Sequence, residues 1–492
     1  MKTLILAPQY REEERKNAQL LCDYLREEGA FCSFMDSEII RAALIEESTY
    51  QLSYSVGSDG SEGRGRAQGG DKGKDSATSS KATETTGRNS SIKLTDEDMA
   101  LLAEASLALD IYLMVKEADC CIGLLNGKDE AVLLKLGIAY ALGIPVYLYK
   151  NDPRVVFIAG ENSMILGLSR YKPFKDVKKL RRRIMRDIDI RNNRYDDENH
   201  NKGGNAFLQR RELSKTICEN LADQIEMGRV VCESYYRKAD KNLYTLLAFL
   251  RERNKENNNL KMEADVDINT DMDIQRSYNE KSDTPCVLDG FSLFKDKAYC
   301  SGPLFSPDEQ REMAKIAAVL EKNGIDTYLP QRDGGEPYFF DSMGSPLSGM
   351  LLAKPFSNLV HRLIFDIDIK EIIECKYFVL NLNGRYYDEG AMAEAGIAYA
   401  LGKVIILFHS DQRDFFRRGL LPLITAITPL KRAVNETGIL AEALEEADIY
   451  SPRQTSKQLT QQLASSYRTG KRALHLLSHI KKPANRMLSW PK

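Results

Sequence analysis

The sequence contains one stretch of seven residues twice. Gly-Ile-Ala-Tyr-Ala-Leu-Gly occupies residues 137–143 and occurs again, without change, at residues 396–402. Leu-Asn-Gly precedes the first copy at 125–127 and the second copy at 382–384. Segments that recur in the same order are the mark of an internal repeat. The chain is therefore interpreted as a tandem duplication of one domain.

Apolar runs and helical patterns alternate in both repeats. In the first repeat, strands are expected at 3–7, 120–125 and 146–149, and helices at 12–28, around 105–115 and at 131–142. In the second repeat, strands are expected at 298–301, 325–329, 377–382 and 404–408, and helices at 308–323, 367–375 and 391–401. Alternation of this kind requires crossover connections, which give a parallel sheet covered on both faces. The sequence predicts an α/β fold: two tandem flavodoxin-like domains, each a doubly wound, mostly parallel sheet with a helical C-terminal extension.

Length and composition set the expected domain boundaries. A chain of 492 residues is too long for one ordinary core, so two domains are expected. We assign residues 1–235 to the first domain and 286–480 to the second, with a polar linker at 236–285 and a loose tail at 481–492. Residues 53–93 consist mainly of Gly, Ser, Thr, Lys and Asp, so they can bury little apolar surface. They are expected to form a disordered insertion in the first domain.

Charge and cysteine usage limit the classes of partner. The formal net charge is -2, without the basic excess that neutralising phosphates requires. Nine cysteines follow no C-x-x-C pattern, and no histidines stand at metal-ligand spacing. No apolar stretch reaches the length of a bilayer span, and no dinucleotide fingerprint or P-loop occurs. We therefore expect a cytoplasmic protein with no nucleic-acid or membrane partner, no metal and no cofactor.

The segment that carries chemistry runs from Asp388 to Ala398, between a predicted strand and a predicted helix. In open parallel sheets this junction lies at the carboxyl ends of the strands, where ligands bind. Gly390 allows a close approach of the backbone to a ligand, and Asp388 and Glu394 can face the same crevice. One carboxylate can attack a sugar or stabilise an oxocarbenium-like centre while another positions hydroxyls. The ordinary alternative for Glu394 is a solvated residue that complements the helix dipole.

The pattern Asp-x-Gly-x-x-x-Glu-x-Gly-x-Ala at 388–398 resembles the signature of the nucleoside 2-deoxyribosyltransferase family. The run Tyr-Cys-Ser-Gly-Pro-Leu-Phe at 299–305 is similar to the family's first strand and loop. Asp368 lies on a helix that resembles the one supplying an acid near the leaving base. Residues 402–413 resemble the closing strand and loop. The resemblance implies cleavage of the N-glycosidic bond of a 2'-deoxynucleoside and transfer of its deoxyribosyl group to a free purine or pyrimidine base.

The resemblance also implies roles for individual residues. Glu394 would attack the anomeric carbon and form a covalent 2-deoxyribosyl intermediate, and Tyr299 would hold that carboxylate. Asp368 would exchange a proton with the departing and arriving bases. Asp388 would accept a hydrogen bond from the 5'-hydroxyl; because a carboxylate there repels phosphate, free nucleosides are favoured over nucleotides. Further substrate contacts are expected from Gly302, Phe305 and Gly390.

The first repeat departs from this pattern at the positions that carry chemistry. Its counterparts are Lys135 for Glu394, Ala131 for Gly390, Leu4 for Tyr299 and Ile111 for Asp368, with Asp110 one position early. A lysine is a cation where the reaction needs an anionic nucleophile, so we expect this repeat to be catalytically inactive. Enzymes that resemble this chain generally use a neighbouring subunit to complete each pocket. We therefore hypothesise that the first repeat serves as that neighbour in an internal pseudo-dimer, or else that the chain forms a homo-oligomer.

Three functions stay open at this point. The first is transfer of deoxyribose between bases. The second is hydrolysis of deoxynucleosides or deoxynucleotides by water, and the third is a non-catalytic sensor or scaffold for a nucleotide derivative. Tyr299 and Phe305 could also be core aromatics, and Asp368 an ordinary helix charge. No amide after Arg413 clearly completes the pocket, and Asn435 is the nearest candidate.

Overall fold

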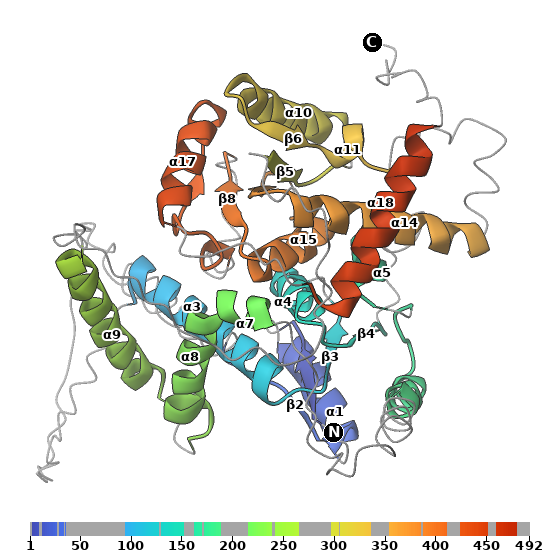
Figure 1. The fold of residues 1–492 in the computed structure, drawn as a ribbon. Helices are drawn as coiled ribbons and strands as arrows, with labels where there is room; N and C mark the ends of the chain where they lie inside the picture. Colours follow the sequence, from blue (N-terminus) through green and yellow to red (C-terminus); the bar gives the residue numbers. More distant parts are fainter. Residues whose placement is uncertain are drawn as a thin grey trace, which may run out of the picture.

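The computed structural model describes residues 2–8, 12–26, 29–33, 35, 94–126, 129–151, 162–169, 172–187, 215–238, 242–264, 297–304, 306–335, 354–384, 387–410, 424–450 and 459–479. Their strands form two parallel sheets, one in each half of the chain (Figure 1). The expected insertion at 53–93, the expected tail at 481–492 and Phe305 lie outside the described residues.

The first sheet has the strand order β2-β1-β3-β4. Its strands are β1 (Thr3–Leu6), β2 (Ala30–Phe31), β3 (Cys120–Leu124) and β4 (Val146–Tyr149). The helices of this half are α1 (Glu12–Tyr24), α3 (Asp96–Lys116), α4 (Glu130–Ala141), α5 (Ser163–Leu168), α7 (Lys215–Asn220), α8 (Ala222–Val231) and α9 (Leu243–Ala264), with a π-helical turn at Cys232–Tyr236. Every strand pairing is parallel.

The second sheet has the order β6-β5-β7-β8-β9. Its strands are β5 (Lys297–Ser301), β6 (Asp326–Tyr328), β7 (Tyr377–Asn381), β8 (Val404–Phe408) and β9 (Ala433–Val434). Its helices are α10 (Pro307–Lys322), α11 (Pro330–Asp333), α14 (Lys354–Glu374), α15 (Glu389–Ala400), α17 (Leu440–Tyr450) and α18 (Gln461–Ser478), with a 3-10 turn at Thr437–Ile439. Counted from the first strand of each half, both sheets read 2-1-3-4, and the second continues to 5. This is the flavodoxin-like order, so the predicted α/β class with parallel sheets is confirmed.

Alternating side chains of β5 belong to two different cores. Ala298 and Cys300 pack with the buried faces of α10 and α17 on one side of the sheet. Tyr299 packs on the other side, in a core that joins residues of α14 and α15 to residues of α3 and α4. Successive side chains of a strand point to opposite faces, so Ser301 has the same facing as Tyr299. The side chain of Ser301, at the carboxyl end of β5, therefore lies on the face of the sheet that α15 covers.

Helices α4 and α15 pack directly on one another near the centre of the molecule (Figure 1). A Cβ on Gly137 would lie 2.1 Å from the carbonyl oxygen of Ala393, and a Cβ on Gly396 would lie 2.0 Å from that of Leu134. The contact is reciprocal, because each glycine of the repeated heptapeptide touches the residue three positions before the other glycine. The two copies of the heptapeptide thus bring α4 and α15 into close backbone contact across the two halves of the chain.

Helix α9 lies inside the range predicted as a linker. Leu243, Leu246, Leu247 and Leu250 follow the i, i+3, i+4, i+7 spacing of one helix face and join the central core. Arg251 binds Asp98 at the start of α3, with Nη2 2.6 Å from Oδ2. Residues 243–251 therefore belong to the packed first half; the polar composition after residue 254 concealed this short apolar face.

The described residues were compared with the requirements of membrane spans, disulfides and metal sites. Among the described helices, none is long and apolar enough to cross a membrane. The eight cysteines in the described part of the chain are free thiols. No group of three or more His, Cys, Asp or Glu within these ranges could hold a metal ion.

Candidate active site

The strand order places the switch point of the second sheet between β5 and β7. At this point the direction of strand addition reverses, so the carboxyl ends of the two strands border a crevice where ligands bind in open α/β sheets. Strand β5 ends at Ser301, and helix α15 begins at Glu389, shortly after β7. The segment predicted to carry chemistry therefore begins at this edge.

Glu394 is buried at this edge, with 6% of its surface exposed. It lies in the second turn of α15. Its Oε2 accepts a hydrogen bond of 2.6 Å from the hydroxyl of Ser301. The carboxylate is thus directed toward the end of β5 and away from bulk solvent.

Tyr299 and Asp368 are connected through Tyr328. The ring of Tyr299 stacks on the rings of Tyr328 and Phe378, with centroids 5.1 Å and 5.4 Å away. The hydroxyl of Tyr328 donates a hydrogen bond of 3.0 Å to Oδ1 of Asp368. Tyr299 and Asp368 are both buried. The packing of β5, β6 and α14 thus brings these two predicted residues into one cluster, joined by a tyrosine that the sequence analysis did not select.

Asp388 forms the N-cap of α15. Its Oδ1 accepts a hydrogen bond of 2.7 Å from the backbone N–H of Ala391, which explains why the helix begins at the next residue. Burial raises the pKa of Asp388 to about 7, although the N–H of Ala391 acts in the opposite direction. A carboxyl group in this state gains and loses its proton near neutral pH.

Gly390 makes room for a residue of the first half. A Cβ on Gly390 would lie 2.8 Å from both Oδ1 and Nδ2 of Asn162, and 3.0 Å from Oδ1 of Asp388. Asn162 caps α5, because its Oδ1 accepts the N–H of Met164 at 2.8 Å. No local pattern marks Asn162 in the sequence, since only the packing of the two halves brings position 162 to position 390.

The remaining predicted contacts have different outcomes. A Cβ on Gly302 would lie 2.7 Å from Cβ of Asn381 and 2.9 Å from Sδ of Met313, so a larger residue would not fit here without a shift of its neighbours. Phe305 lies outside the described residues. Asn435, the nearest amide by sequence, is exposed.

The first half has a buried ion pair at the corresponding place. Nζ of Lys135 lies 2.6 Å from Oδ2 of Asp110, and each side chain is 3% exposed. The hydroxyl of Ser33 donates to Oδ1 of the same carboxylate. The position that holds Glu394 in the second half thus holds a cation, which the neighbouring acid neutralises.

The expectation that Asp110 is out of register with Asp368 is wrong. Two glycine contacts fix the register of α3 and α14: Gly228 with the carbonyl of Ala108, and Gly470 with the carbonyl of Asp366. Asp110 and Asp368 each lie two residues after these carbonyls, so they occupy equivalent positions. The error arose because one more residue separates α3 from β3 than separates α14 from β7. In the first half, the counterparts of Glu394 and Asp368 are therefore in direct contact.

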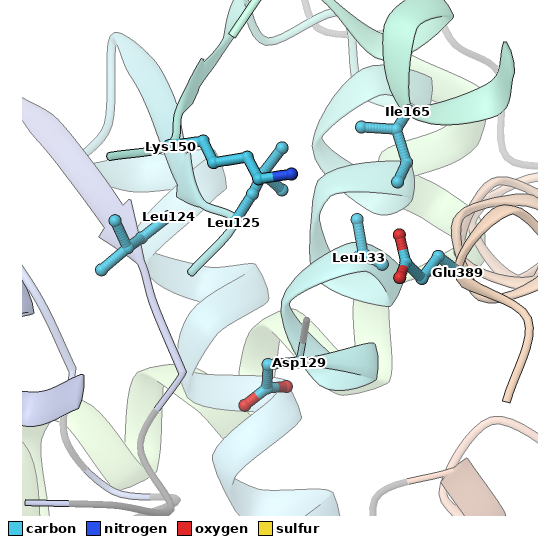
Figure 2. Close-up of a pocket in the computed structure, with 7 residues that line it drawn as sticks. All are labelled: Leu124, Leu125, Asp129, Leu133, Lys150, Ile165 and Glu389. Atoms are coloured by element: carbon cyan, nitrogen blue, oxygen red, sulfur yellow. The ribbon is translucent and has the colours of Figure 1, made fainter. Parts of the chain in front are cut away.

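A hollow beside the start of α15 belongs mainly to the first half (Figure 2). Its lining residues are Leu124, Leu125, Asp129, Leu133, Lys150, Ile165 and Glu389. In Figure 2 the side chains of Lys150 and Glu389 reach toward it from opposite sides. Glu394, Tyr299 and Asp368 do not line it. The candidate active site is thus defined by the carboxylates at the edge of the second sheet and not by this hollow.

Comparison with known proteins bears on the second half of the chain. A comparison with curated protein sequences finds no match. A match to a family begins in β5 and extends beyond α17, so it includes Tyr299, Asp368, Asp388 and Glu394. Residues 298–456 match the family model of nucleoside 2-deoxyribosyltransferase, a family of transferases.

Proposed function

We propose that this chain cleaves the N-glycosidic bond of 2'-deoxynucleosides and transfers the 2-deoxyribosyl group to a free purine or pyrimidine base. The observation that carries the proposal is Glu394, buried at the switch point of the second sheet and hydrogen-bonded by Ser301. The family match over residues 298–456 supports the same reaction type.

In the proposed reaction, an oxygen of Glu394 attacks C1' of the sugar. The bond between C1' and the base nitrogen breaks, its electron pair stays on the base, and Asp368 gives that base a proton. The product is a 2-deoxyribosyl ester of Glu394. An incoming base then attacks C1', loses its proton to Asp368 and releases the Glu394 carboxylate. Tyr299 supports the cluster in which these groups lie.

The sugar is positioned by the start of α15. Asp388 accepts a hydrogen bond from the 5'-hydroxyl, and Gly390 and Gly302 keep the backbone close to the substrate. Phe305 flanks the base. Since Asp388 carries negative charge when ionised, it disfavours a 5'-phosphate, and free deoxynucleosides are the preferred substrates.

The first half acts as an attached, inactive neighbour. Its Lys135–Asp110 ion pair supplies no anionic nucleophile, because a cation stands where the second half has Glu394 and Asp110 is bound to that cation. Its Asn162 lies against Gly390 at the start of α15, where an amide can complete the sugar site. The duplication inferred from the sequence is supported by the shared strand order and by the reciprocal contact of Gly137 and Gly396.

Two measurements on the full-length protein test the proposal. Intact mass after exposure to a 2-fluoro-2-deoxynucleoside should increase by one fluorodeoxyribosyl group, because fluorine slows release of the intermediate. Glu394→Ala should abolish the increase. Incubation with deoxyinosine and adenine should yield deoxyadenosine, whereas free sugar would indicate hydrolysis instead.

The same variant tests the inactivity of the first half. Glu394→Ala leaves Lys135 and Asp110 in place, so any base exchange that survived in it would have to come from the first half and would contradict the assignment. If the wild-type protein binds deoxynucleosides but neither exchanges nor releases the base, a non-catalytic binding function replaces the proposal.

A further inference from the structure

We propose that Ser301 is a positioning residue for the nucleophile: its hydroxyl holds Oε2 of Glu394 and thereby fixes the orientation of the attacking carboxylate. This inference rests on the proposed function and adds a residue to which neither the family pattern nor the match assigns a role.

The geometry of the contact is that of a charge-assisted hydrogen bond. Oγ of Ser301 lies 2.6 Å from Oε2 of Glu394, within the range of about 2.5–2.7 Å that is usual for a hydroxyl donating to a carboxylate. Ser301 is 1% exposed and Glu394 6% exposed, so little water competes for this donor. A hydrogen bond to a carboxylate is stronger in such surroundings than in water.

The donor is held by a rigid element. Ser301 is the last residue of β5, and it pairs with Leu380 of β7 in the sheet. The next residue, Gly302, is packed so closely on Asn381 and Met313 that a methyl group would not fit. Groups placed on strands are positioned more precisely than groups on loops. The hydroxyl can therefore fix the end of the long Glu394 side chain, which would otherwise sample several rotamers.

The hydrogen bond from Ser301 to Glu394 contributes to both steps of the proposed reaction. A hydrogen bond to the charged form of a carboxyl group keeps it ionised, so Glu394 is available as an anionic nucleophile in the first step. One oxygen of the oriented carboxylate forms the new bond to C1', and the other becomes the carbonyl oxygen of the ester. When the incoming base takes the sugar, the electron pair of the bond between C1' and the carboxylate oxygen returns to Glu394. Ser301 then stabilises the carboxylate as a leaving group, and its own proton stays on Oγ throughout.

The first half offers an internal comparison. Leu6 lies at the position of Ser301, since it pairs with Gly123 of β3 as Ser301 pairs with Leu380 of β7. The helix beside it presents Lys135, which binds Asp110. The end of the first strand thus carries a hydroxyl in the half with the carboxylate and a leucine in the half with the lysine, as expected for a group that holds an anion.

The test compares Ser301→Ala with Ser301→Thr in the full-length protein. Ser301→Ala should slow trapping by a 2-fluoro-2-deoxynucleoside and lower kcat by about 10- to 100-fold, the usual value of a hydrogen bond to a charged group. KM should change little, and the acidic limb of the pH profile of kcat/KM should move to higher pH. Ser301→Thr keeps a hydroxyl and should restore most of the rate. Thermal unfolding establishes that both variants fold.

The outcomes separate this inference from the proposed function. An unchanged kcat and pH profile in folded Ser301→Ala would overturn the positioning role, and so would a rise in KM alone, which would make Ser301 a substrate contact. A second readout does not need turnover: difference infrared spectroscopy, with Glu394→Gln used to identify the Glu394 band, follows the ionisation of that carboxyl. A higher pKa of Glu394 in Ser301→Ala, found in a protein without base exchange, would support the hydrogen bond while rejecting the proposed function. An unshifted band would reject the hydrogen bond itself.

Discussion

Asp388 caps α15 with the same carboxyl group that is proposed to bind the substrate. Burial raises its pKa from 3.8 to about 7. Because the folded-state pKa lies above the unfolded one, the folded chain binds the proton more tightly. The contribution of this group to the free energy of unfolding is therefore fully present below about pH 4 and is lost as the pH rises through 7.

The charge state of Asp388 predicts how the site treats a 5'-phosphate. Between pH 6 and 8 the carboxyl loses its proton, so inhibition by a 2'-deoxynucleoside 5'-monophosphate should weaken as the pH rises. Repulsion of two unit charges at contact is at least about 1 kcal/mol, roughly a five-fold change in affinity. Inhibition constants measured across this range check the expectation. Asp388→Asn removes the contribution of the carboxyl and leaves that of the phosphate, whose second pKa is about 6; equal slopes in both proteins would contradict the role of Asp388.

The helices of the central layer are held together by glycines that contact carbonyl oxygens. Gly137 and Gly396 join α4 to α15, while Gly228 joins α8 to α3 and Gly470 joins α18 to α14. At each of these four positions a Cβ would lie 2.0 to 2.1 Å from a carbonyl oxygen of the facing helix. The helix axes are therefore closer than any larger residue permits. This spacing determines where α15, and with it Glu394, lies.

Gly396→Ala should destabilise the protein, because the added methyl group forces α15 away from α4. Overpacking of a tight core costs about 1–3 kcal/mol of unfolding free energy, and the rigid carbonyl of Leu134 favours the upper end. Gly438 is a matched control, since nothing lies within 4 Å of a Cβ placed there. Gly438→Ala should leave stability unchanged or raise it by up to about 1 kcal/mol. Urea unfolding of the two variants measures the difference, and similar midpoints would show that the helices can separate without cost.

The two halves of the molecule share one hydrophobic core. Side chains from α3, α4, α14 and α15 form a continuous buried cluster between the two sheets. Asn162 reaches Gly390 across this junction. The proposed function therefore assigns the first half a contribution to the site, through Asn162 at the start of α15.

Asn162→Asp and Asn162→Ala together test this contribution of the first half. Asp keeps the oxygen that caps α5 but loses the amide N–H donors, whereas Ala loses both. If the donor binds the sugar, both variants should raise KM for deoxynucleosides by about 3- to 10-fold, as expected for one neutral hydrogen bond. Trapping at Glu394 should persist in both. Wild-type KM in Asn162→Asp would mean that Asn162 serves only as a helix cap.

The sequence was sufficient for the class of fold and for the position of the chemistry-bearing helix. Apolar runs such as Val404–Phe408, which the structure places in a buried strand, and the alanine-rich run that forms α15 are local signals, read over a few residues. The pattern at 388–398 indicated the start of that helix as the place of the chemistry, and the structure puts Glu394 at the carboxyl edge of a parallel sheet. The apolar face of α9 was harder to predict, because a polar segment follows it. The register of Asp110 was harder because one extra residue lies between α3 and β3, and no local pattern marks it.

By itself, the sequence determined the alternation of strands and helices, the repeated heptapeptide and the residue types available for chemistry. Only the tertiary structure decided which residues meet: Ser301 with Glu394, Tyr328 with Asp368, and Asn162 with Gly390. Periodicity reports which face of an element is apolar, since that depends on neighbours three or four positions away. Contacts between residues far apart in the chain depend instead on how buried faces pack together, and no local pattern records that.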